Sequence, residues 1–200
     1  ACLTGDIGTG KTLLCRMLLN SFQDKANTAL VLHPVLNESE LLSEILDEFK
    51  VPFVSKSQSR TLKTKLDALN EFLLSEAEKG RKSILIIDDA QRLSSEALEL
   101  IRILSNLETE KRKLLHIILV GQPELQKKLQ SEDLRQLGQR ISIAPVLSAL
   151  DEKNTQAYIQ HRLEKVNAAN FVRFHPKAVQ LIYRATHGAP RMINKVCEAA

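Results

Sequence analysis

GDIGTGKT, residues 5–12, is the stretch that decides the fold of this 200-residue chain. It matches the pattern G-x-x-x-x-G-K-[ST] in full. A short apolar run over residues 1–3 precedes it, and an apolar helical pattern that begins at Leu13 follows it. Its three glycines let the backbone curl, so that successive N–H groups point at phosphate oxygens and the positive end of the next helix adds to them. The stretch therefore predicts a strand, a phosphate-binding loop and a helix, in that order.

Two side chains of this stretch indicate that the ligand is ATP with Mg²⁺. Lys11 places a cation in the first turn of a helix, which the helix dipole disfavours by about 0.3–1 kcal/mol unless an anion such as a β- or γ-phosphate offsets it. Thr12 offers a hydroxyl to Mg²⁺. The alternative is a glycine-rich connector that matches by chance. We expect the nucleotide contacts to come from Gly5, Asp6, Ile7, Gly8, Thr9, Gly10, Lys11, Thr12 and Leu13.

A second stretch, ILIIDDAQ at residues 84–91, runs from four apolar residues directly into two carboxylates. Ligands of open α/β sheets bind at the carboxyl ends of the strands, so these acids are predicted to face the phosphate loop. Asp88 would hold Mg²⁺ together with Thr12, and Asp89 would orient the attacking water. The alternative is that the pair caps a helix that begins near Ser94.

Apolar runs with β-branched residues alternate with helical patterns along the first three quarters of the chain. This alternation predicts an α/β fold with a parallel sheet that helices cover on both faces. After Leu147 only helical patterns remain, with capping signals at Asp151 and Pro176. We predict a nucleotide-binding domain over residues 1–146 and a small all-helical domain over 147–200, each truncated at its outer end. The expected strands after the first are 29–32 (ALVL), 84–87 (ILII), 117–120 (IILV) and 141–143 (ISI).

Composition limits the class of protein. At 44% apolar residues the chain can build a core, and no apolar run approaches the roughly 20 residues that cross a bilayer. The three cysteines are scattered without metal or disulfide spacing, which favours core packing in a reducing compartment. Lys and Arg minus Asp and Glu gives −3 for residues 1–100 and +7 for residues 101–200. The basic second half could face nucleic acid, an anionic membrane surface, a neighbouring copy or simply solvent.

Together these motifs resemble the AAA+ ATPases, with Walker A at Gly5–Thr12 and Walker B at Ile84–Asp89. GAPRMIN at Gly188–Asn194 resembles the sensor 2 motif of a helical lid. A narrower resemblance is to the ExeA/GspA and MshM ATPases of type II secretion and MSHA-type pilus biogenesis. It is carried by the run from Asp88 to Leu129 and by the later stretches LRQLGQRI and YIQHRL. The transposition regulator TnsC is a relative of these ATPases. The resemblance covers the whole chain and implies a P-loop αβα sandwich with a small helical lid, which binds ATP and Mg²⁺.

The resemblance also implies roles for residues outside the loop. Gln122, after the strand IILV and Gly121, resembles sensor 1, whose polar side chain contacts the γ-phosphate. Arg140 resembles the arginine finger that reaches a neighbour's nucleotide, with Arg135 as a second candidate. Arg191 resembles the sensor 2 arginine, and its place at a helix start independently suggests a phosphate partner. The expected partners are therefore further copies of this chain and the proteins of a secretion or pilus machine.

One position departs from the family pattern. Asp89 stands where the family usually has Glu, so its side chain is shorter by one methylene and its carboxylate lies further from the nucleotide by roughly the length of one bond. A misplacement of a catalytic group by about 1 Å can lower the rate on the order of a hundredfold. Three functions remain open: an ATPase that drives machine assembly, a nucleotide-gated module with slow or no hydrolysis, and a TnsC-like DNA-binding ATPase. We expect a cytoplasmic module at the inner face of the bacterial inner membrane, with any membrane attachment supplied by segments outside this chain.

Overall fold

A computed structural model of the chain describes residues 1–22, 25–32, 34, 37–52, 61–110 and 112–199. The contacts divide it into two compact units. The sheet unit comprises residues 1–4 and 12–145. The helical unit comprises residues 146–200 together with the phosphate loop, Gly5–Lys11. The sequence predicted a domain boundary between residues 146 and 147, with the phosphate loop in the first domain rather than with the helices. That boundary stays a prediction.

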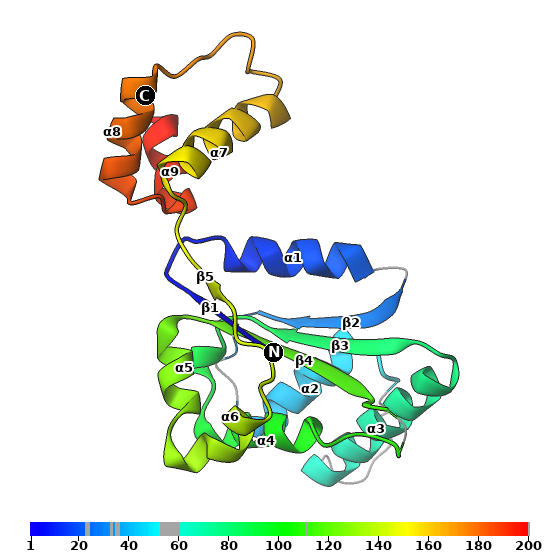
Figure 1. Ribbon diagram of the computed structural model, residues 1–200. Helices are drawn as coiled ribbons and strands as arrows, with labels where there is room; N and C mark the ends of the chain where they lie inside the picture. Colours follow the sequence, from blue (N-terminus) through cyan, green and yellow to red (C-terminus); the bar gives the residue numbers. More distant parts are fainter. Residues whose placement is uncertain (23–24, 33, 35–36, 53–60, 111, 200) are drawn as a thin grey trace. The chain divides into compact units, whose positions relative to one another are not determined.

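A parallel sheet forms the centre of the sheet unit. Four of its strands follow the order β2-β3-β4-β1, and each neighbouring pair is parallel. In β3 every residue after Lys82 is buried, as expected for a strand covered on both faces. Figure 1 shows α1 on one face of this sheet and α2, α3 and α4 on the other. The predicted α/β fold with a parallel sheet is thus confirmed. The strands are β1 (Cys2–Gly5), β2 (Ala26–Val31), β3 (Lys82–Ile87) and β4 (Leu115–Gly121).

The helices of the sheet unit bury apolar side chains that recur at helical spacing. Leu41, Leu42, Ile45 and Leu46 of α2 are at most 2% exposed, and Leu98 and Leu104 of α4 are fully buried. Side-chain caps start these helices at Asn37, Thr61 and Ser94. The helices are α1 (Lys11–Phe22), α2 (Glu38–Glu48), α3 (Leu62–Glu78), α4 (Ser95–Leu104), α5 (Pro123–Leu129) and α6 (Arg135–Gln139), with short 3₁₀ turns η1 (Ala90–Arg92) and η2 (Glu132–Leu134).

The strand predicted at residues 141–143 is wrong. These residues belong to no helix or strand, and the segment that they begin is bonded to β1 by two backbone hydrogen bonds, from Cys2 N–H to Ile143 O (2.9 Å) and from Thr4 N–H to Pro145 O (3.1 Å). Pro145 has no N–H to return to β1, so a regular ladder cannot form there. The last strand, β5, is only Val146–Leu147.

A buried carboxylate ties the end of α3 to the sheet. Glu76 is 4% exposed and accepts hydrogen bonds from Asn27 Nδ2 (2.6 Å) and Lys79 Nζ (2.8 Å), and it forms an ion pair with Arg81 Nε (2.7 Å). The hydrogen bond from Lys79, aided by Asn27 and Arg81, holds the pKa of Glu76 below its ordinary value against the opposing effect of burial. Stability therefore depends on this group staying ionised.

The helical unit has its own small core of Ile159, Val179, Ile182 and Ile193. Asp151 caps α7 by accepting from Asn154 N–H at 2.7 Å, as the sequence predicted. Proline opens both later helices. None of the helices in the described ranges combines the length and the apolar character that a membrane span requires. These helices are α7 (Glu152–Lys165), α8 (Pro176–Thr186) and α9 (Pro190–Glu198).

Candidate nucleotide site

The phosphate loop is curled and bonded to itself. Gly8 and Gly10 have φ angles of +83° and +100°, a region that side chains with a Cβ rarely adopt. Lys11 is 8% exposed, and its Nζ donates to Gly5 O and Asp6 O, both at 2.8 Å. Thr9 Oγ1 donates to Asp6 O at 2.9 Å. A buried ammonium that is bonded to neutral carbonyls can still attract an anion, which fits the predicted phosphate ligand.

Arg191 lies directly against this loop, within the helical unit. Its N–H donates to Gly8 O at 3.2 Å, and a Cβ added to Gly8 would lie 3.0 Å from the Cβ of Arg191. Arg191 follows Pro190 in the first turn of α9 and its side chain is exposed. The structure therefore brings together two cations that the sequence singled out, Lys11 and Arg191, on one loop and the helix start beside it.

The start of α1 is bonded to the end of β3, within the sheet unit. Thr12 Oγ1 donates to Asp88 Oδ2 at 2.5 Å, although the two residues are 76 positions apart. Asp88 is 2% exposed, and its N–H donates to Val31 O at 2.9 Å, which continues the β2–β3 ladder by one residue. The two predicted metal ligands are thus in contact.

The fit of this pair to Mg²⁺ rests on its donor set. A hydroxyl and a carboxylate are both hard oxygen ligands, and Mg²⁺ is usually bound by one or two carboxylates plus water and substrate phosphates rather than by a full protein cage. Across the described residues, no group of three His, Cys, Asp or Glu side chains could hold a metal ion. The Thr12 hydroxyl and the Asp88 carboxylate are thus of the ligand type that Mg²⁺ takes, with its remaining ligands supplied by water or phosphate.

Asp89 occupies an uncommon backbone conformation, with φ +51° and ψ +33°. Its N–H donates to Asp88 Oδ1 at 2.9 Å, and its Oδ1 accepts from Gln91 Nε2 at 3.2 Å. The alternative role of the acid pair as a helix cap is not observed. Ser94 caps α4 instead, accepting from Ala97 N–H at 3.1 Å, and Asp89 makes no side-chain cap to η1.

Gln122 follows the neighbouring strand end. It is half-buried, its side chain makes no capping bond to α5, and its N–H donates to Gln91 Oε1 at 3.1 Å. Gln91 therefore joins Asp89, two residues after β3, to Gln122, the residue after β4. The sequence did not predict this contact. The only signal was its place in the stretch ILIIDDAQ, three residues after Asp88.

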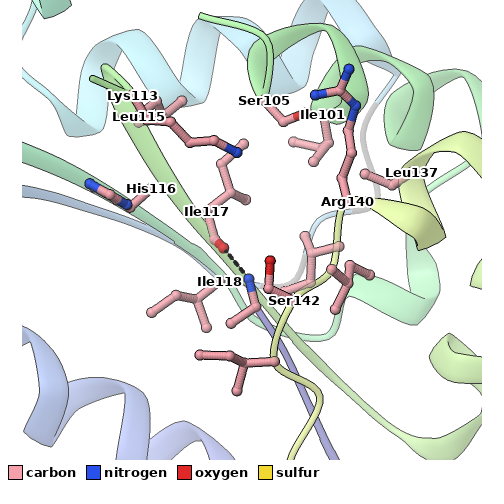
Figure 2. A pocket seen from close by; sticks show the side chains of 14 residues that line it. Ile101, Ser105, Lys113, Leu115, His116, Ile117, Ile118, Leu137, Arg140 and Ser142 are labelled. Carbon is pink, nitrogen blue, oxygen red and sulfur yellow. Dashed lines mark hydrogen bonds between the residues drawn. The ribbon is translucent and has the colours of Figure 1, made fainter. Parts of the chain in front are cut away.

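The candidate arginine fingers lie elsewhere. Arg135 and Arg140 are exposed, at the start and the C-cap of α6. Arg140 lines a cavity of about 430 Å³ over the first half of β4 (Figure 2), with Leu115 and His116 on its wall. Asp88 follows the opposite end of the neighbouring strand, so one chain does not bring Arg140 to its own acids. A role for Arg140 at a nucleotide would require a second copy.

Ile7 and Leu13 complete the predicted nucleotide contacts. Their side chains are 65% and 61% exposed. Because neither side chain is polar, their contribution to phosphate binding would come from backbone N–H groups.

Comparisons with known proteins identify the family of this chain. Residues 1–129 match the family described as an AAA domain. The chain is 40% identical over 198 residues to general secretion pathway protein A of Aeromonas hydrophila, an alignment that covers 99% of this chain and 36% of that protein. The chain thus spans about a third of the length of this relative.

Solved structures show the same fold at low sequence identity. The Aeropyrum pernix ORC2 protein in its ADP form aligns with a TM-score of 0.68 and 19% identity, over 100% of this chain and 57% of that one. Cdc6p of Pyrobaculum aerophilum has a TM-score of 0.61 and 21% identity, over 82% and 43%. The Thermotoga maritima RuvB Holliday junction branch migration motor has a TM-score of 0.60 and 19% identity, over 98% and 52%. These likenesses show the fold alone, and it is the predicted P-loop fold class. The match over residues 1–129 shows that the chain belongs to the AAA domain family, within which it resembles general secretion pathway protein A, as the sequence predicted.

Proposed function

We propose that this chain is a Mg²⁺-dependent ATP-hydrolysing module that drives or regulates the assembly of a secretion machine. The observation that carries the proposal is the 2.5 Å hydrogen bond between Thr12 and Asp88. It places the hydroxyl that follows the phosphate loop on the carboxylate that follows β3, and a P-loop NTPase requires both of these groups on its metal ion. The secretion role is supported by the name and the 40% identity of the Aeromonas relative.

Each polar group of the site has a distinct task in this proposal. The loop N–H groups and Lys11 hold the β- and γ-phosphates. Thr12 and Asp88 would hold Mg²⁺, and the bound ion would supply positive charge to the phosphate oxygens. Asp89 orients the attacking water, and Gln122 contacts the γ-phosphate. Arg191, whose N–H is bonded to the loop at Gly8, contacts the nucleotide from the start of α9.

Arg140 has a different task, because it acts from a neighbouring copy. Its exposed place on α6, away from the acids of its own chain, supports a homo-oligomer in which one subunit completes the next subunit's site. An arginine supplied in this way stabilises the charge of the transition state and affects turnover far more than nucleotide affinity.

Nucleotide binding is tested first. Lys11→Ala removes a charged donor, which is worth about 1.5–3 kcal/mol, so ATP affinity measured by titration calorimetry should fall at least tenfold. Lys63→Ala, which removes an exposed lysine from α3, is the matched control and should bind as the wild type does. Equal ATP affinity of the Lys11 variant and the control would rule out the site.

A second candidate function is a nucleotide-gated interaction module that hydrolyses slowly or not at all. It is favoured by Asp89, whose short carboxylate is bonded to Gln91. Turnover of the wild type beside Asp89→Glu separates the two functions. A faster Glu variant indicates that the short acid limits hydrolysis, and equal rates exclude that explanation.

A DNA-binding function, in the manner of TnsC, rests on the basic second half of the chain, which has a formal charge of +7. Such contacts would go to the phosphate backbone and would weaken steeply with salt. Binding of duplex DNA with ATP at low salt tests it, and failure to bind there removes this function.

A further inference from the structure

Gln91 contacts both strand ends that carry the predicted hydrolytic residues. It lies on η1, two residues after Asp89, and is partly buried. Its Nε2 donates to Asp89 Oδ1 at 3.2 Å, and its Oε1 accepts from Gln122 N–H at 3.1 Å. A carboxylate accepts only and a backbone N–H donates only, so these two bonds set the orientation of the amide.

Among side chains of this reach, an amide is suited to this position because it carries a donor and an acceptor at once. Glutamate could accept from Gln122 N–H but could not donate to Asp89, and its charge would oppose the carboxylate. Methionine has a similar length and would make neither hydrogen bond. Glutamate at position 91 would therefore remove the contact with Asp89 alone, and methionine would remove both contacts.

Gly121 leaves the space through which this amide passes. A Cβ added there would lie 2.7 Å from Gln91 Oε1 and 2.8 Å from Leu125 Cδ2. Gly121 is the last residue of β4, one position before Gln122. The absent side chain at Gly121 and the amide at Gln91 are thus complementary, and a change at either residue should displace the other.

The backbone of Asp89 explains why such support matters. With φ +51° the residue is in the left-handed region, which a non-glycine residue occupies only when its surroundings hold it there. The bond from Asp89 N–H to Asp88 Oδ1 holds the main chain, and Gln91 holds the carboxylate. The direction of the carboxylate therefore depends on a side chain that is itself anchored to the end of β4.

We propose that Gln91 is a positioning residue for ATP hydrolysis, one that aims the Asp89 carboxylate and ties its position to the backbone of Gln122. This inference rests on the proposed function, in which Asp89 orients water and Gln122 contacts the γ-phosphate. A shift of the β4 end when Gln122 meets a phosphate would be transmitted through the Gln91 amide to the acid. Hydrolysis is thereby linked to correct placement of the nucleotide.

The test compares Gln91→Met and Gln91→Glu with the wild type, and Gln130→Met at an exposed position serves as the control. Both Gln91 variants should lower kcat by about 10- to 100-fold, the effect of misplacing a catalytic group by about 1 Å, with ATP affinity within about threefold of wild type. Thermal unfolding of each variant identifies a general loss of structure.

Amide hydrogen exchange at Gln122 separates the two hydrogen bonds without relying on turnover. It should become faster in Gln91→Met and stay near the wild-type rate in Gln91→Glu, which keeps the acceptor. Gly121→Ala should lower kcat in the wild type, but by much less when Gln91→Met is already present, because both changes displace the same amide.

The outcomes separate this inference from the proposed function. A wild type that binds ATP but shows no turnover refutes hydrolysis as the function, while unchanged Gln122 exchange in Gln91→Met refutes the link itself. A wild type that turns over, with either Gln91 variant at the wild-type kcat, overturns the positioning role and leaves the ATPase assignment intact.

Discussion

Gly8→Ala is predicted to strain the phosphate loop in two ways. At φ +83° an alanine is in a left-handed conformation, which costs about 1–2 kcal/mol. Its Cβ would also lie 3.0 Å from the Cβ of Arg191. Arg191 cannot easily withdraw, because its Cβ is fixed to a helix backbone whose N–H is bonded to Gly8 O.

The strained loop can relax by flattening at residue 8, which turns its N–H groups away from the phosphates. Binding must restore the curl, so up to the full 1–2 kcal/mol appears as lost affinity, roughly 5- to 30-fold in the Kd for ATP. Titration with ATP measures this loss. Gly80→Ala is the matched control, because it has a similar φ of +77° with open space around the added Cβ. It should lose a similar amount of stability without losing affinity.

The contact with Arg191 is isolated by a second substitution. Arg191→Ala keeps the Cβ at position 191, so it should not relieve the crowding in Gly8→Ala. Arg191→Gly removes that Cβ, so Gly8→Ala should cost less ATP affinity in the Arg191→Gly protein than in the Arg191→Ala protein. If Gly8→Ala binds ATP as tightly as Gly80→Ala does, the reasoning about loop strain is refuted.

Three further predictions concern other parts of the chain. Glu76→Gln should destabilise the protein by only about 1–2 kcal/mol at neutral pH, because the cationic partners of Glu76 are half exposed and therefore screened by solvent. The hydrogen bond from Lys79 lowers the pKa of Glu76, so the stability advantage of the wild type is full above the ordinary value of 4.5 and is lost as the pH falls through the lowered pKa. Denaturant unfolding at several pH values measures this loss. Gly188→Ala should prevent correct folding of the helical unit, because its Cβ would lie 1.7 Å from Leu150 O; a normal circular dichroism spectrum and melting curve would contradict this. Arg140→Ala should keep ATP affinity and lose turnover, and mixing it with Lys11→Ala should restore some activity if the arginine acts across subunits; activity of Arg140→Ala at the wild-type rate would exclude that role.

The sheet and the loop could be predicted because their signals are local. A parallel strand covered on both faces must be apolar throughout, which ILII shows directly, and a phosphate loop needs glycines and a lysine at fixed spacing. The segment at 141–143 also carries two isoleucines, but Pro145 prevents a regular ladder with β1. Apolar composition alone does not reveal whether each residue of a segment can donate its backbone N–H to the neighbouring strand.

The parts that could not be predicted depend on distant residues meeting. The bond from Gln91 to Gln122 needs the left-handed turn at Asp89 and the register that aligns Ile87 with Leu119. Neither is visible in the spacing of DDAQ. The role proposed for Arg140 is further removed, because it would depend on a second copy of the chain.

The self-bonded phosphate loop has a thermodynamic consequence. Its curl is held by bonds from Lys11 to Gly5 and Asp6 and from Thr9 to Asp6, all within the loop. The conformational entropy of ordering these residues is therefore lost when the protein folds rather than when ATP arrives. Phosphate recognition by this loop should accordingly show a small change in heat capacity, unlike recognition by a segment that must fold around its ligand.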